Sequence, residues 1–302
     1  RPMIAIITCL NNRPHISPLI FECAKRLNKD QIYTHLIVGY SSPEDEKLAV
    51  EWSVECPWVH PVGPIDNVPG FKWNEVLKYA YNSVSEFEGF IIMGDDDSMS
   101  DEYFHYIYWC ASAYRPEYLG TNINAFIEQK TGKALKHRYE MKNKLIGAGR
   151  YVSRHAIEKT CVRQPIIMKR ELKIHGVTYA QSSRECVEVS VANYLCSYGY
   201  AQRSGEVMFL GLWPDKAKQG LDHHSELNLV WNGFAPMCIA FDDRIHISDV
   251  KSSKDGAPAN IHTFSILSSG GSKGGLINEC TFDDATWFMN DNEKQLCNTK
   301  LK

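Results

Sequence analysis

The segment Gly89-Phe-Ile-Ile-Met-Gly-Asp-Asp-Asp97 joins an unbroken apolar run to three consecutive carboxylates. Such a run is typical of a strand buried on both faces, as in a parallel sheet. Met3–Thr8 and Tyr33–Gly39 have the same character and predict two more strands. Apolar residues at helical spacing predict intervening helices, over Ser17–Leu27, Glu44–Glu55 and Val68–Tyr81. This alternation predicts an α/β fold with a mostly parallel central sheet flanked by helices.

The predicted strands also indicate where a ligand binds. In open α/β sheets, ligands bind beyond the carboxyl ends of the strands. Thr8, Gly39 and Asp95 lie at those ends in the sequence. Downstream the pattern is less regular; it predicts helices over Asp101–Tyr114 and Ser183–Gly199 and strands over Leu119–Ile127 and Glu206–Trp213.

The composition is that of an ordinary folded protein. Of the 302 residues, 44% are hydrophobic and 23% are charged, which excludes a disordered, collagen-like or heptad-dominated chain. No apolar run approaches the roughly 18–20 residues of a membrane span, so we expect no membrane-spanning segment in this sequence. The ten cysteines show neither Cys-x-x-Cys pairs nor zinc-ligand spacing. They predict reduced thiols in a cytoplasmic protein, or in the host cytoplasm if the source is viral.

The acidic triplet Asp95-Asp96-Asp97 needs a compensating charge. Adjacent carboxylates repel one another, and a divalent cation such as Mg²⁺ or Mn²⁺ is the simplest partner for hard oxygen ligands. In an extended segment residues i and i+2 point the same way, so Asp95 and Asp97 are expected to face one site and Asp96 another. The alternative is a solvated acidic turn without a metal.

Four separated motifs resemble GT-A fold glycosyltransferases of the family-2 general type, over about residues 3–200. One is the turn after the first strand, one precedes the metal motif, one is the strand with its Asp-x-Asp motif, and one is the helix that carries the catalytic base. They are Ile7–Arg13, Asn67–Asn74, Phe90–Asp97, and Arg184–Val189 running on to Gly199-Tyr200.

The resemblance implies a nucleotide-diphosphate sugar as donor, most simply a UDP-sugar. Thr8 and Arg13 would lie near the nucleoside, and the ribose or diphosphate would lie near Asn67, Gly70 and Lys72. The triplet would also serve the donor: Asp95 would contact ribose or metal, Asp96 the donor, and Asp97 the metal. A histidine from the C-terminal part often completes such a metal site; His246 is favoured here over His223 and His224.

The predicted catalytic base departs from the family pattern. The usual Asp falls on Cys186, and a thiol is a poor carboxylate substitute. Glu185 is therefore the expected base that deprotonates the acceptor hydroxyl, with Glu188 behind it. The stereochemical outcome stays open, because exostosin-like retaining enzymes also carry an acidic triplet.

The net charge of −3 hides a strong segregation. Residues 130–175 hold 13 Lys and Arg against 3 Asp and Glu, a net +10, and the remainder carries −13. A basic stretch with interleaved tyrosines is suited to an anionic acceptor such as nucleic acid. The candidate acceptor-binding residues are Lys136, Arg138, Lys142, Lys144, Arg150 and Tyr151. The alternatives are an anionic glycan, a phosphate-bearing lipid carrier or a merely solvated face.

These observations predict a metal-dependent glycosyltransferase whose acceptor is anionic, with the hydroxymethylated DNA bases modified by some bacteriophage enzymes as one candidate. A glycan or protein acceptor, a sugar nucleotidyltransferase, and a binding module with a degenerate site are the other hypotheses. The expected organisation is a catalytic domain over residues 1–215, with a donor half (1–100) and an acceptor half (101–215). Residues 216–302 are expected to form a C-terminal extension packed on it.

Overall fold

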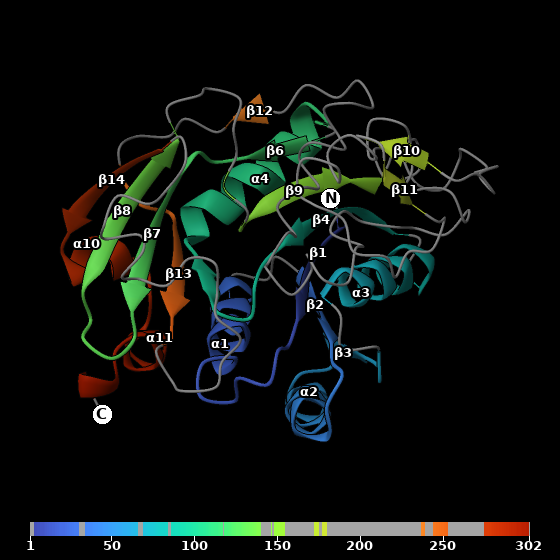
Figure 1. Ribbon diagram of the computed structural model, residues 1–302, viewed down its shortest axis with the longest axis horizontal. Helices are drawn as coiled ribbons and strands as arrows, with labels where there is room; N and C mark the ends of the chain where they lie inside the picture. Colours follow the sequence, from blue (N-terminus) through green and yellow to red (C-terminus); the bar gives the residue numbers. More distant parts are fainter. Residues whose placement is uncertain are drawn as a thin grey trace.

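The computed structural model shows two sheets with helices packed on them (Figure 1). It describes residues 3–29, 34–65, 69–83, 86–116, 118–139, 146, 148–154, 172–174, 177–179, 237–238, 244–252 and 275–301. No helix among these residues is long and apolar enough to cross a membrane.

The larger sheet has seven strands in the order β12-β6-β9-β4-β1-β2-β3. Strands β4, β1, β2 and β3 run parallel, β9 is antiparallel to both β4 and β6, and β12 is parallel to β6. Their bounds are β1 Met3–Cys9, β2 Thr34–Gly39, β3 Val59–Val62, β4 Phe87–Ile92, β6 Tyr118–Gly120, β9 Arg150–Ser153 and β12 Met237–Cys238. The predicted α/β class with a mostly parallel central sheet is confirmed.

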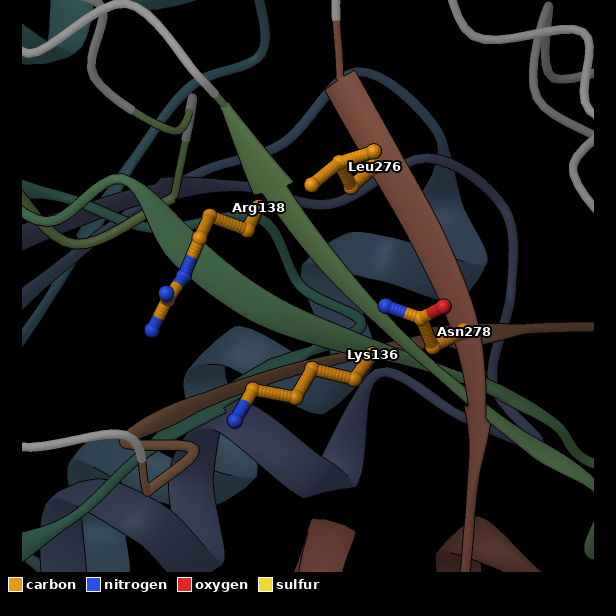
Figure 2. A pocket seen from close by; sticks show the side chains of 4 residues that line it. All are labelled: Lys136, Arg138, Leu276 and Asn278. Atoms are coloured by element: carbon orange, nitrogen blue, oxygen red, sulfur yellow. The ribbon is translucent and has the colours of Figure 1, made fainter.

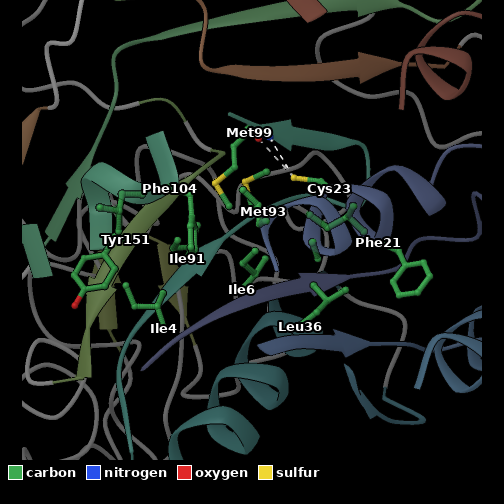
Figure 3. Packing of buried hydrophobic residues seen from close by; sticks show 14 of the residues in the cluster. Ile4, Ile6, Phe21, Cys23, Leu36, Ile91, Met93, Met99, Phe104 and Tyr151 are labelled. Carbon is green, nitrogen blue, oxygen red and sulfur yellow. Dashed lines mark hydrogen bonds between the residues drawn. The ribbon is translucent and has the colours of Figure 1, made fainter. Parts of the chain in front are cut away.

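Helices cover both faces of this sheet. They are α1 Pro18–Leu27, α2 Pro43–Glu55, α3 Pro69–Ser83 and α4 Asp101–Ala113. Side chains of β1 alternate between the faces: Ile4 and Ile6 pack in the core with α1, α2 and α4, whereas Ala5 and Ile7 pack against α3. Figure 3 shows Ile4 and Ile6 in the first of these cores.

The predicted strands and helices of residues 3–114 are confirmed to within two residues at each end. Strand β3 was not predicted. It is a four-residue edge strand that contains Pro61, and a proline in a short segment conceals the strand pattern. A proline begins each of α1, α2 and α3, where its missing N–H costs nothing.

The second sheet has five strands in the order β14-β8-β7-β13-β5. Their bounds are β5 Asp97–Met99, β7 Ile123–Glu128, β8 Ala134–Tyr139, β13 Ile247–Lys251 and β14 Gly275–Cys280. The single strand predicted over Leu119–Ile127 is wrong, because β6 and β7 belong to different sheets. Thr121 and Asn122 break it: the Thr121 Oγ1 accepts from Ile123 N, and Asn122 Nδ2 donates to the Tyr139 carbonyl.

The C-terminal part of the chain helps to build this second sheet. It contributes β13 and β14, and the short helices α10 (Phe282–Thr286) and α11 (Asp291–Cys297) pack on one face with part of α1. A two-stranded hairpin, β10 (Leu172–Ile174) with β11 (Val177–Tyr179), and the 3-10 helix η4 (Thr299–Leu301) complete the described elements. The predicted division at residue 215 stays a prediction, since it lies outside the described residues.

Candidate metal and donor site

The acidic triplet forms a tight turn between β4 and β5. Asp97 N donates to the Gly94 carbonyl over 3.3 Å, and Gly94 N donates to Asp97 Oδ2 over 2.6 Å. A Cβ on Gly94 would lie 2.7 Å from Asp96 Oδ1 and 2.8 Å from Asp97 Oδ2, so a side chain at this position would displace both carboxylates. The expectation that Asp95 and Asp97 share one site and Asp96 faces another is wrong, because it assumed an extended chain.

Asp95 is held by protein groups on both of its oxygens. Arg13 Nη2 donates to Asp95 Oδ1, and Ser17 Oγ donates to Asp95 Oδ2 over 2.6 Å. The other end of the Arg13 guanidinium donates to Asp96 Oδ2 over 2.6 Å. Although burial disfavours the charged guanidinium, the two carboxylates raise the pKa of Arg13 above its ordinary value. The first aspartate of the triplet is therefore part of a buried ion pair.

Three other carboxylates converge beside this ion pair. Asp96, Asp97 and Asp249 each offer an oxygen within 4.8 Å of the others, and we call them the carboxylate cluster. Asp249 lies on β13, directly opposite Asp97 on the antiparallel strand β5. Val250 N donates to the Asp96 carbonyl over 2.8 Å, which ties the acidic turn to β13. Strand pairing thus brings residues 152 positions apart into one site.

Burial and like charge perturb the cluster. Burial, then the neighbouring Asp249 and Asp96, hold the pKa of Asp97 well above its ordinary value. Burial also raises the pKa of Asp249 to about 6, although Lys251 Nζ lies 2.5 Å from its Oδ2. Asp96 behaves differently: despite its burial, Arg13 and Lys251 lower its pKa. The neighbouring cations therefore stabilise the ionised form of only one cluster member strongly enough to lower its pKa.

The carboxylate oxygens at this site fit a hard divalent cation as ligands. Asp95 and the carboxylate cluster supply four carboxylates, and the cations paired with them are Arg13 and Lys251, which leaves two formal negative charges. Asp249 Oδ1 is buried and has no hydrogen-bond partner among the described residues. A buried carboxylate oxygen without a partner is costly unless something else neutralises it. Mg²⁺ or Mn²⁺ is bound by oxygen ligands of this kind.

Asp249 is the residue that the sequence did not reveal. It stands in the strand segment Ile247-Ser248-Asp249-Val250-Lys251, where apolar and polar residues do not strictly alternate. The signal that the sequence offered for a functional residue here was an acid and a base two positions apart, Asp249 and Lys251, which point to the same face of a strand. Which distant residues they would meet depends on the pairing of β13 with β5 and β7.

The predicted donor-binding residues lie around the same edge of the large sheet. Thr8, the last residue but one of β1, is fully buried, and its Oγ1 has no hydrogen-bond partner among the described residues. Lys72 on α3 is also buried and donates from Nζ to the Leu10 carbonyl over 2.6 Å. Gly70 lies in the first turn of α3, and Asn67 lies outside the described residues. Their contacts with a donor stay predictions.

His246 lies near the site but outside the carboxylate cluster. Its Nδ1 is 2.8 Å from Ser100 Oγ, and its ring packs edge-on against Trp287 with centroids 5.6 Å apart. Its predicted role as a metal ligand therefore stays a prediction. The remaining predicted residues Glu185, Glu188, Lys142, Lys144, His223 and His224 lie outside the described residues.

The described acceptor candidates fall into two groups. Lys136 and Arg138 on β8 line a pocket of about 170 Å³ with Leu276 and Asn278 of β14, as Figure 2 shows. Arg150 and Tyr151 instead lie buried in the large sheet, and only 2% of the surface of Tyr151 is exposed. A base cannot stack on a ring that is enclosed in this way.

The pocket lies on the opposite face of the second sheet from Asp249. Asp249 pairs across the strands with Phe126, whereas Ser248 aligns with Ala125 and, through it, with Lys136. Neighbouring residues of one strand point to opposite faces. Lys136 and Arg138 therefore share the face on which α10 and α11 pack, and an acceptor that reaches both regions has to pass around the edge of the sheet.

Comparisons with known proteins give only distant similarities. No protein-family model matches the sequence, and no curated protein sequence is similar to it. Among solved structures, the chain is similar to residues 1–349 of S. aureus TarS in complex with UDP-GlcNAc, with a TM-score of 0.47 and 10% identity over 86% of this chain and 61% of that one.

Two further TarS structures are similar to the chain. For residues 1–349 of S. aureus TarS the TM-score is 0.38, with 14% identity over 52% of this chain and 48% of that one. For S. aureus TarS the TM-score is 0.44, with 9% identity over 82% of this chain and 36% of that one. The chain thus spans less than two-thirds of the length of each of these proteins. Similarities this low do not assign a function.

Proposed function

We propose that this protein is a metal-dependent GT-A glycosyltransferase that uses a nucleotide-diphosphate sugar. The observation that carries the proposal is the convergence of Asp96, Asp97 and Asp249 at the carboxyl end of β4, where one buried oxygen has no hydrogen-bond partner in the described part of the chain. This edge of a parallel sheet is where α/β proteins bind their ligands. Of the sequence motifs that resemble these enzymes, Ile7–Arg13 and Phe90–Asp97 end at the same edge.

Several charged groups would have a part in the proposed reaction. Asp96, Asp97 and Asp249 would hold Mn²⁺ or Mg²⁺, which when bound stabilises a departing diphosphate. Arg13 fixes the acidic turn by bonding to Asp95 and Asp96. The resemblance supplies Glu185 as the base that takes the proton of the acceptor hydroxyl, and its position next to Cys186 makes it the residue to test first.

For the acceptor we propose an anionic polymer. The pocket residues Lys136 and Arg138 provide positive charge on the face away from the carboxylate cluster, so a ligand that contacts both regions has to be extended. Duplex DNA with hydroxymethylated bases has these properties, and the basic segment 130–175 adds to the attraction. A gel-shift series from about 50 mM salt upward tests it, because phosphate contacts are strongest at low salt.

The outcome of that series depends on the acceptor. We expect binding to DNA that weakens as salt rises and weakens further in Lys136→Glu/Arg138→Glu. No binding at the lowest salt would exclude a nucleic-acid acceptor and favour a glycan or protein. A Lys29→Glu/Lys47→Glu variant serves as control, because it makes the same change in charge at exposed positions outside the pocket and outside residues 130–175.

The reaction itself is tested with a panel of nucleotide sugars, with and without Mn²⁺, by release of free nucleoside diphosphate. We expect release from one donor, lost in Asp97→Ala and retained in Glu102→Gln, which removes a half-exposed carboxylate on α4. Full activity of Asp97→Ala would refute the metal assignment. Pyrophosphate release from a nucleoside triphosphate and a sugar phosphate would show a nucleotidyltransferase instead.

A further inference from the structure

We infer that Arg26 and Glu293 are positioning residues that hold Asp97 and Asp249 in place from the opposite face of the second sheet. The inference rests on the proposed function, because it concerns the cation that the carboxylate cluster would bind. It assigns a role to α11, near the C-terminal end of the described chain and far in sequence from the acidic triplet.

The two residues form a buried, two-point ion pair between α1 and α11. Arg26 Nε lies 2.7 Å from Glu293 Oε2, and Arg26 Nη2 lies 3.0 Å from Oε1. Arg26 is 8% exposed and Glu293 is fully buried. Paired charges at this depth gain little net stability, since the cost of removing them from water offsets their attraction. A fixed geometry is the more specific consequence of such a pair.

The ion pair is bonded directly to β5, the strand that begins with Asp97. Ser98 Oγ donates to Glu293 Oε1 over 2.7 Å, and Arg26 Nη2 donates to the Met99 carbonyl over 2.7 Å. Cys23 Sγ of α1 accepts from Met99 N at 3.5 Å, a contact visible in Figure 3. In the described sheet β5 is a three-residue edge strand paired only with β13. Its backbone therefore depends on these contacts for its position.

The same arrangement is repeated on β13. Ser248 lies directly opposite Ser98, and its Oγ donates to the Ala285 carbonyl of α10 over 2.5 Å. Because side chains alternate along a strand, the two serines point toward the helices while Asp97 and Asp249 point to the other face. The helices thus fix both strands through the serines, and the two aspartates keep their mutual register.

The experiment measures Mn²⁺ affinity of the full chain, by calorimetry without donor, together with its thermal midpoint. The double variant Arg26→Met/Glu293→Leu replaces the ion pair with apolar groups of similar size. Because Ser98 Oγ, the Met99 carbonyl and Asn290 N also lose a partner, we expect a lower thermal midpoint and, in the folded protein, a Kd for Mn²⁺ raised at least tenfold. The control is Cys297→Ala, a change on the same helix as Glu293 that opens a packing gap beside Met289. This variant should keep the wild-type Kd.

Each alternative outcome has one meaning. Unchanged Mn²⁺ affinity in the double variant would overturn the positioning role, as would an equal loss of affinity in Cys297→Ala. A wild-type protein that binds no Mn²⁺ would instead refute the metal site of the proposed function. If the double variant does not fold, Ser98→Ala decides, because it removes only the hydroxyl that links β5 to Glu293 and Arg26. We expect a several-fold rise in Kd, whereas an unchanged Kd would overturn the inference.

Discussion

Replacing Asp249 with asparagine should have opposite effects on the metal-free and metal-bound protein. The variant keeps the shape of the side chain but removes one negative charge from the carboxylate cluster. Without a cation that charge is unfavourable, because Asp249 is buried beside Asp96 and one of its oxygens has no partner among the described residues. With a cation the same charge becomes a ligand.

The size of the first effect follows from the pKa of Asp249, which burial raises from an ordinary 3.8 to about 6. The folded state binds the proton more tightly than the unfolded state, so the ionised carboxylate costs folding free energy at high pH. Raising a pKa from 3.8 to about 6 corresponds to about 3 kcal/mol. This value is the upper bound of the increase in the free energy of unfolding that the variant can show. The cost is fully present above pH 6 and disappears as the pH falls below about 4.

Urea denaturation in EDTA therefore has a defined expected result. At pH 7.5 Asp249→Asn should raise the free energy of unfolding by up to about 3 kcal/mol, and the difference should approach zero at pH 4. Lys251 retains its attraction to Asp96 and Asp97 in the variant. Asp283→Asn, an exposed change on α10, is the control and should stay within about 0.5 kcal/mol of the wild type.

Adding Mn²⁺ should reverse the order. At a thousandfold excess over Kd, binding stabilises the wild type by about 4.1 kcal/mol, which exceeds the advantage of the variant in EDTA, and the variant should lose most of this gain. A variant that is less stable than the wild type in EDTA at pH 7.5 would refute the reasoning, because it would show that Asp249 is satisfied by the protein alone. Equal stabilisation of both proteins by Mn²⁺ would show that Asp249 is not a ligand.

Three further predictions test the turn, the core and the base. Gly94→Ala should raise the Kd for Mn²⁺ at least tenfold in calorimetry, because its Cβ would displace the Asp96 and Asp97 carboxylates; an unchanged Kd would show that the turn can adapt. Trp52→Ala should lower the free energy of unfolding by about 3–5 kcal/mol, since the Trp52 ring stacks on Phe21 in the core with ring centroids 4.9 Å apart. The folded variant should keep the wild-type affinity for Mn²⁺. Glu185→Gln should abolish sugar transfer while equilibrium binding keeps the donor Kd, and loss of turnover in Glu188→Gln alone would move the base to that residue.

The part of the site that the sequence predicts is the part built from local pattern. The apolar run before Asp95 identifies a buried strand, which the structure confirms, and the α/β alternation predicts that ligands bind at the end of that strand. The prediction that Asp95 and Asp97 face one site and Asp96 another was wrong, because the directions of these side chains depend on a turn of two residues. That turn brings Gly94 close to Asp96 and Asp97, an approach that no periodicity indicates.

The residues that sequence reasoning missed share a different property: each acts through a strand or helix distant in the chain. Asp249 reaches Asp97 only because β13 pairs antiparallel with β5, and a shift of that pairing by one residue would place Ser248 in the site instead. Glu293 reaches Ser98 from the far face of the same strand. The bonds that prevent such a shift lie on the side of the sheet away from the carboxylates, so the chemistry at one face depends on polar groups buried beneath the other. This is why a site with one recognisable motif in the sequence still needs β13 to supply its third carboxylate and α11 to keep that carboxylate aligned.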